Sequence, residues 1–501
     1  MKKVIALFLA LAVALSLVAC GSASQQETTG DTAGTTVETT QATEETFSPI
    51  YTRPSEDADH TEDSLENEEN QEDTPVEEQE SSSSDSGSSA SSAGAATDGD
   101  TGDTFSDGAV TSTVQFAAKN LTWSNINSFK IKSSSMSVAE LRQLCVDFFR
   151  FAKTALWTPD EGFDYIRNIK GTEDSMTGGS LYGGLPYVGS SNGNIYRLMD
   201  YINESTGKVD ISDALKLTGS RLDMKALAYF GNQCANGAYQ GWGRVINSVS
   251  KHYTAAMTPS NGYIPLGNYK HGPLMESTWT TTYGTDECCK ENGEQVMYQA
   301  YAKVQIADGL VYYTTAGHVI MASSDAHVEY LPDGNIDGKN SYIIIIDQAQ
   351  KWETQTSGGK KYQFKSSVDA KVSFEKLYSS NYVPYTFGEF LGTDAVEATT
   401  YSFSHKDSTI TKQQLLSASA TSNYGITDAY AIVTDASGRE VYKHAVRNTS
   451  SYGTTLKMAV EGKANVDTWG KLESGTYTVK VQLQLATGER PIVYTGTLTV
   501  D

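Results

Sequence analysis

Hydrophobic positions divide the chain into a long polar stretch followed by two patterned regions. Residues 21–112 contain hardly any large apolar side chains. From about residue 114 apolar residues recur, first at helical spacing and then in short runs, and from about Glu397 they alternate with polar residues. A period of about 3.6 is typical of amphipathic helices, and a period of about 2 of half-buried strands. We therefore expect ordered structure only after the polar stretch, with helices before strands.

The clearest helix is predicted directly after Ser137. Ser137 and Glu140 have the spacing of a capping box. The apolar residues that follow recur at helical spacing: Leu141, Leu144, Cys145, Phe148, Phe149, Ala152 and Leu156. Trp157-Thr158-Pro159 ends this pattern. We expect Cys145, on the apolar face, to be a small core residue.

Shorter patterns predict further elements. Helices are expected at Ile195–Ile202, Ile211–Leu217 and from Ala235 to Ile246. Strands are expected at Gln295–Ala307, Leu310–Thr315, His318–Ser323 and Ser341–Ile346. Helices that precede an antiparallel sheet give an α+β arrangement. We assign this α+β domain to residues 113–395.

Strict alternation predicts a β-sandwich at the C-terminal end. Every second residue from Tyr477 to Leu485 is apolar, Thr487-Gly488 turns the chain, and Ile492–Val500 returns. Tyr430–Thr434 and Glu440–Tyr442 flank a second turn. We expect residues 396–501 to form an all-β sandwich of immunoglobulin or fibronectin type. Its residues suggest no catalytic cluster, so it is a spacer or a module that binds the wall or a partner.

The first residues indicate export. Two lysines precede an apolar run from Val4 to Ala19, which is too short to span a membrane comfortably. The run ends in Leu17-Val18-Ala19-Cys20, which resembles the lipobox of bacterial lipoproteins. That resemblance implies that residues 1–19 are removed and that Cys20 is lipidated. We expect an extracellular lipoprotein anchored to the cell membrane of a Gram-positive bacterium.

The negative charge is concentrated in the polar stretch. Of the 61 acidic residues, 23 lie between Gly21 and Ser112, beside a single lysine or arginine, Arg53. A segment so polar and charged cannot bury enough apolar area to fold, so residues 20–112 are predicted to be a disordered tether. Residues 113–501 hold 38 acidic against 35 basic residues. A nucleic-acid partner therefore has no electrostatic support.

Cys234 is the candidate nucleophile. No CxxC occurs, and the adjacent Cys288-Cys289 pair closes at best a strained ring, so neither a disulfide framework nor a zinc site is favoured. Cys234 opens a predicted helix after Asn232 and Gln233, which are candidate caps. A helix N-terminus lowers the pKa of a thiol, and its N–H groups can stabilise an oxyanion. The alternative is a buried structural cysteine. We expect no metal and no other cofactor.

His318 is the candidate base. It follows Gly317 at the start of an apolar strand, so its ring is expected at a sheet edge, within reach of a facing helix. The other histidines of this part of the chain have more polar neighbours, and only His327 competes; they are His252, His271, His327, His405 and His444. Asp347 and Gln348 end a neighbouring strand, and one of them can orient the imidazole. Alternation directs them to opposite faces, and Asp347 is favoured over Gln348.

In their chain order these residues resemble a known family. A Gly- and Tyr-rich segment (Tyr182–Tyr187), a cysteine that opens a helix (Cys234), Gly-His-Val at a strand start (His318) and a polar residue at a later strand end follow one another as in the NlpC-like cell-wall cysteine peptidases and their CHAP relatives. The resemblance spans about residues 180–350. It implies a papain-like fold and cleavage of the D-γ-glutamyl to diamino-acid bond in peptidoglycan stem peptides. It also implies that Tyr187 lies beside the nucleophile and helps to stabilise the oxyanion.

The chain departs from the family in three places. Gln233-Cys234-Ala235-Asn236 replaces the usual Asp-Cys-Ser-Gly, and the intervals from Tyr187 to Cys234 and from His318 to Asp347 are longer. The bond that is cleaved therefore stays open. An N-acetylmuramoyl-L-alanine amidase of the same fold is one alternative. A second is a non-catalytic adhesin or glycan-binding protein that uses aromatic platforms such as Trp242 and Trp279, and a third is a metal-dependent hydrolase. We expect a monomer in each case.

Overall fold

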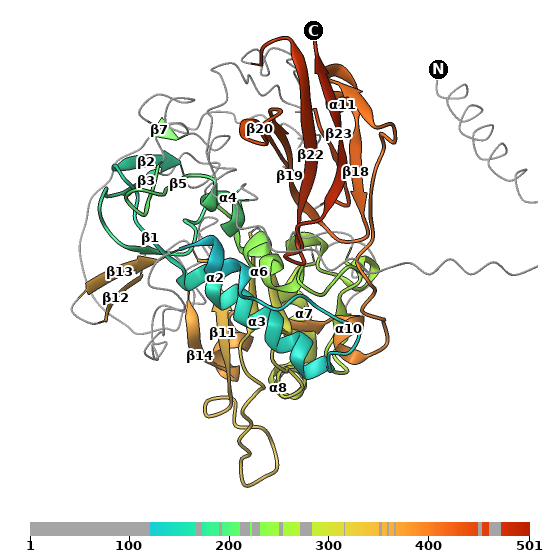
Figure 1. Ribbon diagram of the computed structural model, residues 1–501. Coiled ribbons are helices and arrows are strands. Elements are labelled where there is room, and N and C mark those ends of the chain that lie inside the picture. Colours follow the sequence, from blue (N-terminus) through green and yellow to red (C-terminus); the bar gives the residue numbers. More distant parts are fainter. Residues whose placement is uncertain are drawn as a thin grey trace, which may run out of the picture. The chain divides into compact units, whose positions relative to one another are not determined.

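Figure 1 shows a computed structural model of the protein. It describes residues 121–166, 173–189, 193–210, 221–222, 231–249, 254–270, 283–314, 316–349, 353–357, 360–364, 367–448, 453–459 and 472–501. The predicted signal peptide, Cys20, the predicted tether, the expected helix Ile211–Leu217 and Trp279 all lie outside these residues. The described residues belong to one compact unit, Pro49–Asp501. Within them, no helix combines the length and the apolar character that a membrane crossing requires.

Helix α3 (Val138–Thr154) confirms the capping-box prediction. The Ser137 hydroxyl accepts a hydrogen bond from the Glu140 N–H, and the Glu140 carboxylate accepts one from the Ser137 N–H. Cys145 is fully buried on this helix, as expected. Beside it runs α6 (Cys234–Trp242), which contacts α3 along its length (Figure 1). A Cβ at Gly241 would lie 2.7 Å from the Cys145 carbonyl oxygen, so glycine permits this close approach.

Helix α6 packs on a six-stranded antiparallel sheet. The strand order is β14–β11–β10–β9–β15–β8. The strands are β8 (Ile264–Pro265), β9 (Gly309–Tyr313), β10 (Gly317–Ala322), β11 (Tyr342–Asp347), β14 (Val368–Ser373) and β15 (Val383–Thr386). Three predicted strands are thereby confirmed as β9, β10 and β11. The buried side chains of α3, α6 and this sheet form one hydrophobic core.

The strand predicted at Gln295–Ala307 is wrong. This stretch holds α8 (Glu294–Tyr301), which follows α7 (Thr285–Asn292). Met297, Tyr298, Ala300 and Tyr301 are buried, which is helical spacing, so tertiary packing overrides the β-propensity of its valine and tyrosines. The helix expected from Ala235 to Ile246 starts one residue earlier and ends at Trp242, and the one expected at Ile195–Ile202 is α4 (Ile195–Met199).

A second core is formed by residues between Leu121 and Val209, among them Phe148, Phe151 and Ala152 of α3, and the other elements in and beside it are short. These are α2 (Trp123–Asn127), β1 (Leu156–Trp157), β2 (Phe163–Ile166), β3 (Glu173–Met176), β4 (Tyr182–Gly183), α4, β5 (Ile202–Asn203), β6 (Lys208–Val209) and β7 (Arg221–Leu222). The hairpin of β12 (Glu353–Ser357) and β13 (Lys360–Phe364) extends β4. The remaining short helices are η3 (Thr254–Ala256), η4 (Pro259–Asn261), α9 (Phe374–Ser379) and α10 (Gly388–Leu391).

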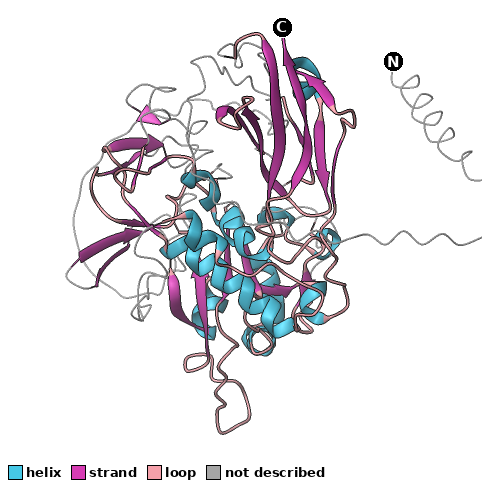
Figure 2. Ribbon diagram, in the orientation of Figure 1, coloured by secondary structure: helices cyan, strands magenta, loops and turns pink. Residues whose placement is uncertain are grey.

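Residues 396–501 form two sheets around a core of their own. The larger sheet has the order β17–β23–β22–β19–β20 and the smaller β16–β18–β21. The strands are β16 (Tyr401–Phe403), β17 (Thr409–Thr411), β18 (Ser419–Ser422), β19 (Ile426–Thr434), β20 (Glu440–Arg447), β21 (Thr455–Lys457), β22 (Gly475–Leu485) and β23 (Ile492–Val500), with one short helix, α11 (Lys412–Ser417). Figure 2 shows that strands predominate in this region, whereas helices cover the six-stranded sheet. The protein is thus mixed α+β.

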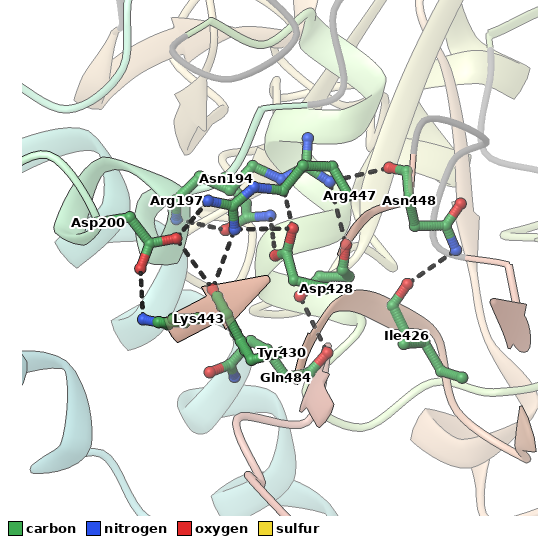
Figure 3. A network of polar contacts seen from close by, with 11 residues as sticks. Asn194, Arg197, Asp200, Ile426, Asp428, Tyr430, Lys443, Arg447, Asn448 and Gln484 are labelled. Atoms are coloured by element: carbon green, nitrogen blue, oxygen red, sulfur yellow. Dashed lines mark hydrogen bonds and ion pairs between the residues drawn. The ribbon is translucent and has the colours of Figure 1, made fainter. Parts of the chain in front are cut away.

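The two regions meet in a buried polar network (Figure 3). Arg197 of α4 donates from Nε to Asp428 of β19 over 2.8 Å, and from Nη2 to the carbonyl of Asn448. Arg447 of β20 pairs with both Asp428 and Asp200. We call this the interface network: Asn194, Arg197, Asp200, Asp428, Tyr430, Lys443 and Arg447. It joins segments more than 200 residues apart.

Candidate active site

Cys234 is the first residue of α6. Its thiol donates to the Gly317 carbonyl over 3.8 Å, and the residue is 4 % exposed. The side-chain cap expected from Asn232 or Gln233 is absent, since the N-cap Gln233 makes no capping bond from its side chain. Cys234 therefore lies in a first turn whose N–H groups have no side-chain acceptor at the N-cap, and the positive end of a helix favours a thiolate.

His318 is the second residue of β10. Strand β10 lies between β9 and β11, so His318 lies at the start of a central strand, at the margin of the sheet where that strand begins. The side chain is 1 % exposed. Its Nε2 atom lies 3.0 Å from an oxygen of Asp347, and the imidazole also interacts with the Cys234 side chain. The structure thus brings Cys234, His318 and Asp347 together.

Strand register explains the pairing of His318 with Asp347. Asp347 lies opposite Ile320 in the antiparallel pair of β10 and β11. His318 is two residues from Ile320, so His318 and Asp347 share one face as diagonal neighbours. The second oxygen of Asp347 accepts the N–H of Ser367 over 2.5 Å. With both oxygens bound, the carboxylate is fixed in position and can orient the imidazole.

The surroundings of His318 favour its charged form. Burial by itself lowers the pKa of the imidazole, but hydrogen bonds to Asp347 and Cys234, together with their negative charges, raise the pKa to about 10. An imidazole with such a pKa holds its proton at neutral pH. An imidazolium beside the Cys234 side chain is the partner that a nucleophilic cysteine requires.

Gln348 does not face His318. Its amide Nε2 donates to the Leu185 carbonyl over 3.1 Å, and its Oε1 accepts from the ammonium of Lys153. Tyr187 is 7 % exposed and lies in the same core as Cys234. Its backbone pairs with that of Asn232, two residues before Cys234. Of the predicted site residues, Cys234, His318 and Asp347 are brought together, Gln348 bonds to Leu185 and Lys153, and Tyr187 shares the core with Cys234.

Lys153 is the residue that sequence reasoning missed. It is fully buried on α3, and its Nζ donates to Gln348 and, over 3.4 Å, to Asn232. Burial lowers its pKa to about 7, against the opposing charges of Asp347 and Cys234. The signal was present in the sequence, because a lysine four residues after Phe149 on the apolar face of a capped helix has to be buried.

Other predicted residues take different places. His327 pairs with Glu329 on the surface. His444, expected to be solvated, is buried in β20, and burial lowers its pKa to about 4. Trp242 cannot be an aromatic platform, because it is 2 % exposed and donates to the Ala307 carbonyl over 2.7 Å.

Thr254 of η3 closes one side of the site. A Cβ at Gly317, the residue before His318, would lie 1.9 Å from the Thr254 hydroxyl. Glycine at 317 therefore lets η3 approach the start of β10, beside the carbonyl that receives the Cys234 thiol. The described segment 254–270 contributes η3 here and strand β8 at the edge of the sheet.

Comparison of the chain with models of known protein families, with curated proteins and with solved structures finds no significant match.

Proposed function

We propose that this chain is a cysteine hydrolase that cleaves peptidoglycan stem peptides, with Cys234 as nucleophile, His318 as base and Asp347 as the residue that orients His318. The observation that carries the proposal is that His318 pairs through Nε2 with Asp347 over 3.0 Å and that the same imidazole interacts with Cys234, the first residue of α6. The third member is Asp347 and not Gln348, because only Asp347 meets the ring.

The reaction follows from this geometry. The Cys234 thiolate attacks the amide carbonyl, and the Cys234 backbone N–H, with Tyr187 beside it, stabilises the oxyanion. The His318 imidazolium protonates the leaving amine, and an acyl-enzyme remains. Neutral His318 then takes a proton from water, whose oxygen attacks the thioester. Collapse of this second intermediate releases the acid and regenerates the thiolate–imidazolium pair.

The substrate and the finer fold rest on resemblance. A capped helix, a nucleophilic helix start and an antiparallel sheet in this order are consistent with a papain-like domain for residues 113–395, and two sheets around one core with an immunoglobulin-like sandwich for 396–501. The NlpC-like pattern of residues 180–350 favours a D-γ-glutamyl-diamino acid endopeptidase. The amidase alternative uses the same three residues.

Cys234→Ala and His318→Ala test the activity. Each variant is expected to lose nearly all release of muropeptides from purified sacculi. Cys234→Ala cannot form the acyl-enzyme, and His318→Ala cannot transfer the proton. His327→Ala is the matched control and should keep full activity, since His327 lies on the surface with Glu329. Activity that persists in Cys234→Ala would end the proposal. Mass analysis of the products separates the two bonds, because only an amidase frees whole stem peptides.

The small exposure of Cys234 makes thiol labelling a second test. At 4 % exposure, a scissile carbonyl reaches the sulfur only if the chain around it moves. We expect iodoacetamide to label Cys234 much faster at neutral pH than Cys145, Cys288 or Cys289, whose pKa values burial raises. A Cys234 thiol as inert as these three would instead favour the non-catalytic binding protein.

We also propose that the enzyme is tethered outside the cell by a lipid on Cys20, so that the acidic stretch 20–112 spans part of the wall. Incorporation of labelled palmitate into the wild-type chain, and its loss in Cys20→Ala, is the expected result. Palmitate incorporation that is unchanged in Cys20→Ala contradicts it.

A further inference from the structure

A buried ammonium lies behind the proposed catalytic residues. Lys153 is fully buried, and its aliphatic stem and charge lie over the Phe149 ring, 5.3 Å from Nζ to the centroid. Its hydrogen-bond acceptors are two neutral amide oxygens, those of Gln348 and Asn232. A buried charge is costly unless opposite charges offset it. The opposite charges that act on Lys153 are Asp347 and the Cys234 thiolate.

The two amides belong to the segments that carry the site. Asn232 precedes Cys234 by two residues, and its backbone exchanges hydrogen bonds with Pro186 and Val188, on either side of Tyr187. Gln348 directly follows Asp347, and its own amide reaches the Leu185 carbonyl. Lys153 therefore joins three segments that are far apart in sequence: the start of α6, the end of β11 and the stretch around Tyr187.

The packing of α6 leaves room for this ammonium. Gly237 is one turn after Cys234, and a Cβ there would lie 3.3 Å from Lys153 Nζ and 2.9 Å from Gln348 Cβ. The helix that presents the thiol thus runs directly against the Lys153–Gln348 pair.

We propose that Lys153 is a positioning residue of the hydrolase site: its ammonium holds the segments of Cys234, Asp347 and Tyr187 together and balances the negative charge of the thiolate and Asp347. Because Lys153 interacts with Cys234 and Asp347, its loss disfavours the thiolate at neutral pH. This proposal rests on the proposed function.

The test compares Lys153→Met with Lys153→Arg in the full-length chain. Methionine keeps the length and removes the charge, while arginine keeps the charge and can donate to both amides. For Lys153→Met we expect the midpoint of the pH profile of Cys234 alkylation by iodoacetamide to rise by about one pH unit. We expect muropeptide release to fall about ten- to a hundredfold in kcat/KM. Lys153→Arg should restore the midpoint and part of the rate.

Cys234→Ala supplies the background of labelling at the other thiols, and circular dichroism confirms that each variant is folded. An unchanged midpoint in folded Lys153→Met, or a Lys153→Arg midpoint that stays with that of Lys153→Met, overturns the role of Lys153. If Lys153→Met does not fold, Lys153→Gln replaces it, with the same expected shift and the same overturning result. Failure of the proposed function looks different, because the wild-type chain itself then shows neither selective Cys234 labelling nor muropeptide release.

Discussion

Among the described residues, two of the buried polar clusters differ in kind: the site around Cys234 and the interface network. Each is built on a buried aspartate, Asp347 in the first and Asp428 in the second, at 1 % and 0 % exposure. Asp428 accepts from Arg197 over 2.8 Å and from Arg447 over 3.3 Å. Asp347 instead meets an imidazole at 3.0 Å. The geometry is similar, but the partners are not.

The partners decide what each cluster can do. Arginine stays protonated in proteins, so the charges of the interface network are fixed at neutral pH. Burial raises the pKa of Asp200 there, but the charges of Arg447 and Lys443 outweigh burial and leave the pKa lowered. In the site the pKa values of His318 and Lys153 are about 10 and about 7. A cluster of fixed charges holds segments together, whereas one that contains titratable groups can move protons.

The largest expected contrast comes from exchanging each aspartate for asparagine. Asp347→Asn removes the charge that orients and supports the His318 imidazolium, so we expect activity to fall by a factor of about a hundred to ten thousand. Release of muropeptides measures this loss. Asp428→Asn is the matched variant, and it should keep a normal pH profile of Cys234 alkylation while losing stability. Equal activity in wild type and Asp347→Asn would show that Asp347 does not act in catalysis. The two clusters would then not differ in function.

Removal of Arg197 is expected to give the next largest effect, on stability. Arg197→Met leaves Asp428 buried with less positive charge, and breaking a buried ion pair costs about 3–5 kcal/mol. Urea unfolding followed by circular dichroism measures the free energy of unfolding. Arg439→Met is a suitable control, because Arg439 pairs with Asp435 on the surface and its loss should cost less than about 1 kcal/mol. A similarly small cost for Arg197→Met would show that the interface network does not stabilise the protein.

Much of the site could be predicted because its signals are local. The capping box at Ser137 marks the start of α3. The apolar runs of β10 and β11 show that His318 lies at the start of one strand and Asp347 at the end of the other. The pairing of Cys234, His318 and Asp347 could be proposed from chain order, but the choice between Asp347 and Gln348 depends on strand register. Register is set by long-range pairing and not by the residues themselves.

The features that escaped prediction are those that long-range packing determines. The sequence predicts a strand where α8 lies, because valine and tyrosine favour strands. The helical period becomes visible only in the residues that α8 buries against the core. The apolar face of α3 marks Lys153 as buried, but it does not reveal the partners Asn232 and Gln348, which come from 79 and 195 residues away. The interface network joins Arg197 to Asp428 in the same way, and no local pattern marks either residue.

A smaller effect separates the two glycines that bring α6 close to its neighbours. Gly241→Ala places a Cβ 2.7 Å from a backbone oxygen, that of Cys145, which cannot give way, so we expect a loss of about 1–3 kcal/mol in unfolding free energy. The nearest neighbours of a Cβ at Gly237 are side-chain atoms, Gln348 Cβ at 2.9 Å and Lys153 Nζ at 3.3 Å, and not backbone. Gly237→Ala should cost less stability than Gly241→Ala but lower the rate of muropeptide release more. A larger loss of stability in Gly237→Ala, or a larger loss of muropeptide release in Gly241→Ala, would contradict this assignment of Gly241 to packing and Gly237 to the site.

The smallest expected effect is the change of the wild-type unfolding free energy with pH. His318 and Lys153 contribute to this change with opposite sign. The folded chain holds a proton on His318 up to about pH 10, whereas the unfolded chain releases it near 6.5. Its contribution to stability is therefore complete below pH 6.5 and is lost as pH rises through about 10. Lys153 acts in the opposite sense: the unfolded chain keeps its proton up to 10.5 and the folded chain releases it near 7, so stability rises between these values.

Between pH 7 and 9.5 the two contributions oppose each other, so the wild-type unfolding free energy should change little with pH at these residues. Lys153→Met leaves the His318 contribution and should become less stable as pH rises, while His318→Gln leaves the Lys153 contribution and should become more stable. Each slope is bounded by about 1.4 kcal/mol per pH unit. Urea unfolding at several pH values measures both, with Arg197→Met as the control, because its loss at the interface network should be the same at every pH. If the unfolding free energies of the two site variants change with pH in the same direction, His318 and Lys153 do not titrate in opposite senses. The two buried clusters would then differ in their hydrogen bonds but not in their response to pH.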